Sequence, residues 1–329
     1  MASEPQYTFP VFEGLPAVTG TPQGCVWGMY DRDGKKDEVG AINLLTPAVV
    51  RAASLEIRTG RHVQLDWALE NLEFPGFHRK PFEQKVIDLS KSLGAYGFDD
   101  EIHINTQSGS QWDSLKHHAY QPGKVFYNGL TFEDALTSNT NGIHNWCERG
   151  GIVGRGILID MVRFYEKRDG KAPNAWERFE IPVADLKAAL ADQGTTPKQG
   201  DLLMVRSGYV RQHNGASTEE RKLGTFGTDK KAIGVANNEE MVKWLYSQHF
   251  SAHIGDTVAF EAWPPPHLGQ WIIHEWSLVW WGAPIGELWN LEGLAAECER
   301  QQRWTFFVTS APLHVKGGVG SPPGAIAIF

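Results

Sequence analysis

The sequence predicts one α/β domain, residues 31–329, preceded by an extended N-terminal arm, residues 1–30. Strand-like and helix-like segments alternate along the chain with no convincing linker between them, which is typical of a single α/β unit. The chain has 329 residues, of which 41% are hydrophobic and 21% charged, an ordinary globular composition for one large domain. Residues 1–30 are rich in Pro and Gly and lack periodicity, so we expect them to be extended.

The helices are predicted from capping residues and apolar periodicity. Thr46 is a suitable N-cap, and Pro47 suits the first helical position of a helix that ends before Gly60. An amphipathic pattern predicts a helix over residues 183–190. Further helices are predicted at 237–245 and 272–281.

The strands are predicted from alternation or from short apolar runs between turn residues. They are expected at residues 62–66, 102–106, 154–160, 200–208, 253–256, 305–309 and 325–329. The Gly-rich stretch 317–324 is expected to be a loop.

Charge and composition exclude several classes of function. The formal net charge is −8 and there is no basic run, so we expect neither nucleic acid nor a membrane as a partner. No stretch approaches the roughly 18 apolar residues that span a bilayer, and the first residues lack a leader pattern. Three scattered cysteines argue against a disulfide framework and favour a reducing, cytoplasmic location.

Thirteen tryptophans are a high number for this length. They predict either a large aromatic core or an aromatic-lined pocket, and several cluster around His274. A flat aromatic small molecule is therefore the expected kind of ligand.

The most informative segment is residues 107–117, Gln-Ser-Gly-Ser-Gln-Trp-Asp-Ser-Leu-Lys-His, which follows a predicted strand. Gly109 allows the backbone to turn tightly. Asp113 and His117 are four residues apart, so they share a face if the segment is helical. If the segment is extended, only a folded loop can bring them together.

This segment resembles the frame H-x-G-T-H-x-D-x-P-x-H of the cyclase family, which includes kynurenine formamidase and isatin hydrolase. Asp113 and His117 match that frame, whereas Gln107 and Gln111 stand where the family has metal-binding histidines. The chain is therefore expected to belong to a divergent branch.

Later segments resemble the same family in the same order, from about residue 24 to 329. Residues 154–160 and 200–208 resemble its G-x-G-V-L-L-D and G-D-x-L-L-x-R-T-G strands. His274 with Glu287 resembles its late H…E-x-L-x-N-L element, and residues 310–322 resemble its closing segment. The resemblance implies a swivelling β/β/α-type domain on a mixed sheet, and a homodimer or homotetramer.

The resemblance also implies roles for four residues. His117 would act as general acid/base, with Asp113 and Glu287 also catalytic. Asp113, His274 and Glu287 would be the metal ligands. No organic cofactor is expected.

Three states of the metal site stay open at this point. Loss of two imidazoles weakens zinc binding, because a Gln amide oxygen is a neutral, hard donor. The site could hold one ion, Mn or Zn rather than Mg, on Asp113, His274 and Glu287. It could hold a harder ion that also uses Gln107 or Gln111. It could hold no metal, with both glutamines donating hydrogen bonds to the substrate.

The expected substrate-binding residues are Gln107, Gln111, Trp112, His144 and Arg155. Arg155 is suited to a substrate carboxylate, although an ion pair with Asp160 or Glu148 is an equal alternative. Asp256 and Glu261 are expected to be solvated loop charges.

The sequence therefore predicts a small-molecule hydrolase that acts on a C–N or C–O bond of a cyclic or aromatic amide, lactam or ester. The alternatives are a metal-independent cyclase, dehydratase or lyase of secondary metabolism, and a non-catalytic small-molecule binding protein. Retention of His117 beside Asp113 argues against the last alternative, because a binding protein needs no acid/base pair.

Overall fold

A large mixed sheet organises the chain in this computed structural model, which describes residues 7–16, 18–225, 227, 229–265 and 271–329. The sheet has nine strands in the order β1-β13-β11-β5-β7-β9-β10-β4-β12. In chain order these are β1 (His62–Gln64), β4 (Gln111–Asp113), β5 (Ile152–Asp160), β7 (Leu202–Arg206), β9 (Ala252–Gly255), β10 (Ile285–Glu287), β11 (Thr305–Ser310), β12 (Gly320–Ser321) and β13 (Ala325–Ile328).

The middle of the sheet is parallel and its flanks are antiparallel. Strands β5, β7, β9 and β10 pair in parallel, and the remaining pairs, including β11 with β5 and β10 with β4, are antiparallel. Parallel strands are normally covered on both faces, which explains why β5 and β7 are nearly continuous apolar runs. The predicted α/β class with a mixed sheet is confirmed.

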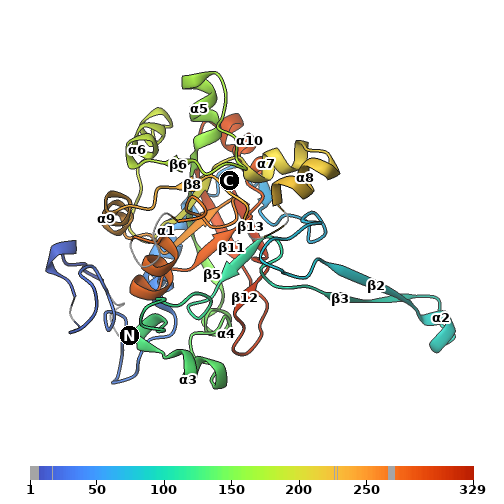
Figure 1. The fold of residues 1–329 in the computed structure, drawn as a ribbon, viewed down its shortest axis with the longest axis horizontal. Helices are drawn as coiled ribbons and strands as arrows, with labels where there is room; N and C mark the ends of the chain where they lie inside the picture. The colour runs from blue at the N-terminus through green and yellow to red at the C-terminus, as the bar shows by residue number, and fades with distance from the viewer. Residues whose placement is uncertain (1–6, 17, 226, 228, 266–270) are drawn as a thin grey trace.

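Helices surround this sheet (Figure 1). The α-helices are α1 (Pro47–Ala53), α2 (Leu89–Ser92), α3 (Phe132–Thr137), α4 (His144–Glu148), α5 (Met161–Asp169), α6 (Val183–Asp192), α7 (Tyr209–Gly215), α8 (Thr218–Thr225), α9 (Glu239–Gln248) and α10 (Glu292–Gln301). Short 3-10 segments lie at Phe12–Gly14, Gly40–Leu44, Ser54–Glu56 and Tyr127–Gly129. Helix α6 packs against both α5 and α9, and α5 and α6 contact the parallel strands.

Several predicted helix boundaries are confirmed by their caps. Thr46 Oγ1 accepts the backbone N–H of Val49 at the start of α1, and Asn238 caps α9 in the same way. The helix predicted at 272–281 is a fully buried π-helical segment, Glu275–Trp281. The strand predicted at 102–106 is β3, which ends at His103 and lies outside the large sheet.

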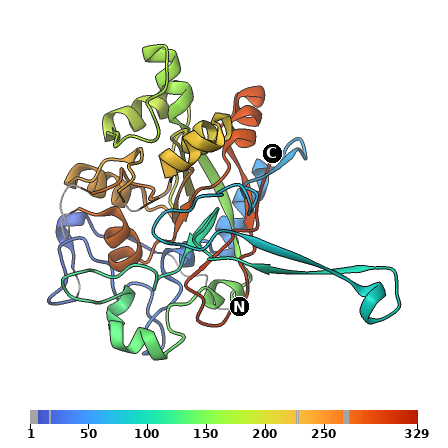
Figure 2. The same cartoon turned by 45° about the vertical axis from the view of Figure 1, so that its right-hand side comes forward.

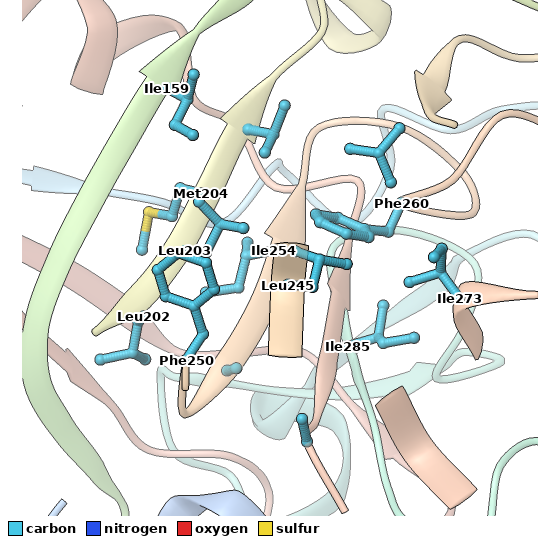
Figure 3. Packing of buried hydrophobic residues seen from close by; sticks show 14 of the residues in the cluster. Ile159, Leu202, Leu203, Met204, Leu245, Phe250, Ile254, Phe260, Ile273 and Ile285 are labelled. Carbon is cyan, nitrogen blue, oxygen red and sulfur yellow. The ribbon is translucent and has the colours of Figure 1, made fainter. Parts of the chain in front are cut away.

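The core lies where the parallel strands meet the helices. Figure 3 shows side chains of β5, β7, β9, β10 and α9 packed together with nearby loop residues: Ile159, Leu202, Leu203, Met204, Leu245, Phe250, Ile254, Phe260, Ile273 and Ile285. The described part of the N-terminal arm joins this core, because Phe12 is buried and its ring meets those of Tyr246 and Trp276.

Two small sheets lie outside the large one. Strands β6 (Glu180–Ile181) and β8 (Gly234–Val235) form a short parallel pair. Strands β2 (Glu83–Asp88) and β3 (Phe98–His103) form an antiparallel ribbon with α2 at its tip. This ribbon projects far from the body in both views (Figures 1 and 2).

None of the helices in the described residues is both long and apolar enough to cross a bilayer.

Candidate metal and catalytic site

Strand β4 presents two polar side chains of the predicted signature on one face of the sheet. Gln111 and Asp113 are separated by one residue, so both point to the same side of the pleated strand. Antiparallel pairing with β10 places Gln111 opposite Glu287. Gln111 Nε2 donates to Glu287 Oε2 at 2.7 Å and to Asp113 Oδ1 at 3.2 Å. Residues 176 positions apart in the chain are thereby joined at one point.

His117 reaches this point through a turn rather than along a helix. The chain leaves β4 after Asp113 and turns, with the backbone N–H of His117 donating to the carbonyl of Ser114 at 3.0 Å. His117 Nε2 then lies 3.8 Å from Asp113 Oδ1. Of the two arrangements that the spacing allows, the structure has the folded loop.

His274 completes the cluster just before the π-helical segment Glu275–Trp281. Its Nε2 lies 3.0 Å from Glu287 Oε1 and 4.0 Å from Asp113 Oδ2. Its Nδ1 lies 2.9 Å from Glu261 Oε2. The ring is therefore held between two carboxylates, which fixes its orientation.

Burial and these neighbours set the protonation of the cluster. Burial raises the pKa of Asp113 to about 6, with Glu287 adding to the rise and His117 opposing it. Burial lowers the pKa of His117 although Asp113 opposes the change, so the ring is neutral near pH 7. Burial also disfavours charge on His274, but the carboxylates of Glu261 and Glu287 outweigh it and hold its pKa well above the usual value.

The donor set fits a divalent cation. Single ligand atoms of Asp113, His117 and His274 all lie within 4.8 Å of one another. Asp113 Oδ2 is buried with no hydrogen-bond partner among the described residues, which is costly for a carboxylate oxygen unless a cation is nearby. Two imidazole nitrogens with carboxylate oxygens suit Zn²⁺ or Mn²⁺. His117 thus stands among the candidate ligands, beside the predicted Asp113, His274 and Glu287.

Gln111 serves as a donor in this arrangement. Its amide nitrogen faces both carboxylates, and its Oε1 has no hydrogen-bond partner in the described part of the chain. The amide N–H groups satisfy one oxygen of each acid, so the carboxylates keep their other oxygens for an ion or a proton.

A cavity of about 180 Å³ opens onto the cluster. Its polar wall includes His117, His274 and Glu287, together with Glu261 and His118. Its apolar wall and rim are formed by Phe77, Val258, Ala259, Trp263, Pro265 and Ile272, with Arg79 among them. A small apolar or aromatic compound would contact the histidines directly, which agrees with the usual mixture of apolar walls and few polar groups in ligand pockets.

Three predicted substrate-binding residues, Trp112, His144 and Arg155, lie outside the cavity that opens onto the cluster. Trp112 points to the opposite face of β4 from Asp113, is fully buried, and donates from Nε1 to Ser310 Oγ at 2.9 Å. His144 accepts the backbone N–H of Gly317 at 3.2 Å and holds the Gly-rich loop. Trp112 and His144 are therefore structural residues.

Arg155 is also structural. Its guanidinium contacts Glu56 Oε1 at 3.1 Å and Asp201 Oδ2 at 2.9 Å, so the ion-pair alternative holds with partners other than Asp160 and Glu148. Because both guanidinium arms are engaged, Arg155 has no role at the cavity.

Gln107 lies beside the cluster rather than in it. It lines a smaller adjoining cavity, and its Nε2 is buried with no hydrogen-bond partner among the residues that the structure describes. A Cβ at Gly320 would lie 2.4 Å from this nitrogen, so the glycine leaves the room that the amide occupies. None of its hydrogen bonds is to a residue of the metal cluster.

Two acidic residues differ from the expectation of solvated loop charges. Glu261 is fully buried against His274, and Asp256 is fully buried, accepting the hydroxyl and backbone N–H of Ser207 at 2.6 Å. No pattern in the sequence separates these acids from surface ones. Arg79, which lines the cavity, was not predicted as a site residue either, because no pattern in the sequence separates it from a surface arginine.

The family of the chain follows from its relatives. The family model described as "Putative cyclase" matches residues 63–262. A crystal structure described as a novel cyclase is 30% identical, covers 92% of this chain and 99% of its own, and superposes with a TM-score of 0.78. No curated protein matches the sequence.

Two more distant structures share the fold. Isatin hydrolase A from Labrenzia aggregata, bound to benzyl benzoate, is 17% identical with a TM-score of 0.56, over 81% of this chain and 93% of its own. Isatin hydrolase A from Ralstonia solanacearum is 18% identical with a TM-score of 0.57, and the match covers 86% of this chain and 97% of its own. The family match and the ordered segments around the Asp113–His274 cluster lead to one conclusion: this chain belongs to the cyclase family.

Proposed function

We propose that this protein is a small-molecule hydrolase that cleaves a C–N or C–O bond of a cyclic or aromatic amide, lactam or ester. The observation that carries the proposal is the convergence of His117, His274 and Glu287 at one apolar-walled cavity, with the buried Asp113 within 4.0 Å of both histidines. The fold shared with isatin hydrolases supports it, because isatin is itself an aromatic lactam.

A single divalent cation, Mn²⁺ or Zn²⁺ rather than Mg²⁺, fits the donors Asp113, His274 and Glu287, which leaves the ring of His117 free to exchange protons. When bound, such an ion polarises a carbonyl group and lowers the pKa of water. Glu261 holds the His274 ring in the orientation in which Nε2 faces Glu287 and Asp113.

His117 is the proposed general acid/base. Its ring is neutral near pH 7, so it can accept a proton from attacking water and return it to the leaving nitrogen or oxygen. Asp113, 3.8 Å away, stabilises the imidazolium that forms in between.

One observation favours a second candidate, a metal-independent cyclase, dehydratase or lyase. Gln111 already donates to both Asp113 and Glu287, so part of the carboxylate charge is satisfied without a metal. In that case His117 and Glu287 would act as acid and base.

The test is elemental analysis of protein purified without chelator or metal affinity resin, with turnover of formanilide and isatin measured before and after EDTA. We expect about one Mn or Zn per chain and loss of turnover on chelation. His117→Ala should lower kcat by roughly 10²- to 10⁴-fold with unchanged circular dichroism. His314→Ala is the matched control, since that histidine is 61% exposed and outside the cavity.

Three results would redirect the proposal. Turnover that survives EDTA in metal-free protein would favour the metal-independent candidate. Full activity of the His117→Ala variant would remove this residue from the mechanism. Binding of isatin without any turnover would favour the non-catalytic alternative.

We further propose that the protein is cytoplasmic and assembles as a homodimer or a homotetramer. The three cysteines are all free, as expected in a reducing compartment. The β2–β3 ribbon supports assembly, because an isolated two-stranded ribbon is marginally stable in water and this one exposes Val86, Phe98 and Ile102.

A further inference from the structure

Arg79 lies at the wall of the catalytic cavity and at that of its smaller neighbour. The side chain is half-buried, and its guanidinium carbon lies 5.1 Å from the centre of the Phe77 ring. Its Nη1 donates to the backbone carbonyl of Gln107 at 2.7 Å. The guanidinium is therefore held in a fixed position at the junction of the two cavities.

This arginine differs from Arg155 and Arg206 in its partners. Arg155 and Arg206 each bind buried carboxylates at 2.9 Å or less, whereas Arg79 forms no ion pair with any described residue. A guanidinium has five N–H donors in a planar fork, and one hydrogen bond to Gln107 uses only one of them. The remaining donors can bind a ligand.

The charge around the groove is unequally distributed. The two cavities share Phe77, Arg79, Val258 and Trp263 as lining residues, so they adjoin, and together they are called the groove here. Glu261 and Glu287 line the end that holds the histidines, and Lys230 and Lys231 line the other end together with Arg79. The chain has a net charge of −8, yet three cations gather here.

We propose that Arg79, with Lys230 and Lys231 at the rim, binds a carboxylate of the substrate. The substrate is then a small aromatic or apolar amide, lactam or ester that carries a carboxylate away from the bond to be cleaved. The statement about the cleaved bond rests on the proposed hydrolase function, whereas the statement about the anion does not.

The geometry gives such a substrate one orientation. A guanidinium binds a carboxylate through two parallel hydrogen bonds, stronger than those between neutral groups. Phe77, Trp263 and Val258 provide an apolar middle between the two ends. Because Glu261 and Glu287 repel an anion, the carboxylate lies toward Arg79 and the uncharged carbonyl lies toward His117. Arg79 is thus a specificity-determining residue.

The test compares benzoate with benzamide, which have nearly the same shape and differ in charge. Binding is measured by calorimetry to the protein as purified and after EDTA treatment. We expect benzoate to bind at least about tenfold more tightly than benzamide, a preference of about 1.4 kcal/mol. The preference should weaken with added salt and persist after EDTA.

Variants assign the preference to Arg79. Arg79→Gln should abolish it, and Arg79→Lys should keep part of it, since the charge remains and the fork is lost. Lys80→Gln is the matched control, because this neighbouring cation pairs with Glu83 at 2.9 Å and does not line either cavity. It should bind benzoate as the unchanged protein does.

Several outcomes would overturn the proposal. Equal binding of the two probes would do so, and so would the absence of measurable benzoate binding. Loss of the preference for benzoate after EDTA treatment would also overturn it, because the carboxylate would then be bound by a metal ion. Equal weakening of both probes by Arg79→Gln would also overturn it, since Arg79 would then only hold the Gln107 loop. Failure of turnover with the preference retained would instead overturn the hydrolase function and leave the anion site.

Discussion

Gln111 shows how one side chain changes the donor set of a site. Its amide lies between Asp113 and Glu287 and donates to both. An imidazole at the same position would offer a nitrogen lone pair, which binds Zn²⁺ better than an amide does.

We therefore expect Gln111→His to raise zinc affinity by at least about tenfold. The measurement is competition with a chromophoric chelator, with Gln107→His as the matched control. Gln107 lines the adjoining cavity, so its substitution should leave zinc affinity unchanged. Unchanged affinity in the Gln111→His protein would show that Gln111 does not face the ion.

Protons compete with a metal ion for this cluster. Asp113 has a pKa of about 6 because of burial, and His274 has a pKa raised well above the usual value by Glu261 and Glu287 despite its burial. Both groups must lose a proton before they can bind a cation.

Mn²⁺ affinity should therefore rise with pH. Below about 6 both protons oppose binding, so the logarithm of the affinity should rise with a slope of up to two. Above about 6 only His274 remains protonated, and the slope should fall toward one. Calorimetric titrations between pH 5.5 and 8.5 measure this, and an affinity independent of pH would contradict the assigned ligands.

At the scale of single residues, the family motif pointed to side chains that the structure brings together, and their roles stay predictions. Asp113, His117, His274 and Glu287 gather as expected. Sequence reasoning failed for Trp112 because alternation along β4 turns every second side chain to the core. It also missed Glu261 and Arg79, whose roles come from contacts between distant segments.

Among the secondary-structure elements, the β2–β3 ribbon exposes large apolar side chains. Cross-strand pairing places Gln84 opposite Ile102, Val86 opposite Asp100 and Asp88 opposite Phe98. The side chains of Val86, Phe98 and Ile102 therefore share one face of the ribbon, and all three are exposed. A second copy of the chain would cover this face.

If the proposed dimer forms through this face, we expect Val86→Glu combined with Phe98→Glu to raise its dissociation constant by roughly a hundredfold or more, since each buried side chain contributes about 2 kcal/mol. Light scattering after gel filtration measures the mass. Lys85→Glu, on the opposite face of the same strand, should leave the mass unchanged. If the protein without substitutions has the mass of a monomer at all concentrations, assembly through the ribbon is refuted.

Helices and strands with strong local signals were predicted well. Thr46 and Asn238 cap the helices as expected, because caps act within one turn. The ribbon strand β2 was missed because its pattern, Glu-Gln-Lys-Val-Ile-Asp, lacks a continuous apolar face. The strand predicted at 102–106 belongs to the same ribbon, and its pairing partner is set by the turn at α2.

For the whole molecule, stability depends on ion pairs that join distant segments. Arg155 of β5 contacts Glu56 and Asp201, and all three side chains are at least 88% buried. Removing one partner of such a pair leaves an unpaired buried charge.

We expect Arg155→Gln to lower the free energy of unfolding by about 3 kcal/mol without changing metal affinity. Urea denaturation measures the loss. Arg58→Gln is the matched control, because Arg58 approaches the same Glu56 at 3.8 Å from an exposed position, and its loss should cost less than about 0.5 kcal/mol. A large effect on metal binding would show that Arg155 acts at the site after all.

The sequence by itself determined the α/β class, most parallel strands, the capped helices and the four residues of the cluster. These features depend on local pattern or on a motif with fixed spacing. The tertiary structure alone decided that Glu261 orients His274, that Gln111 bridges two carboxylates, and that Arg79 faces the cavity. The physical reason is that each of these roles comes from the packing of segments far apart in the chain, which no local pattern records.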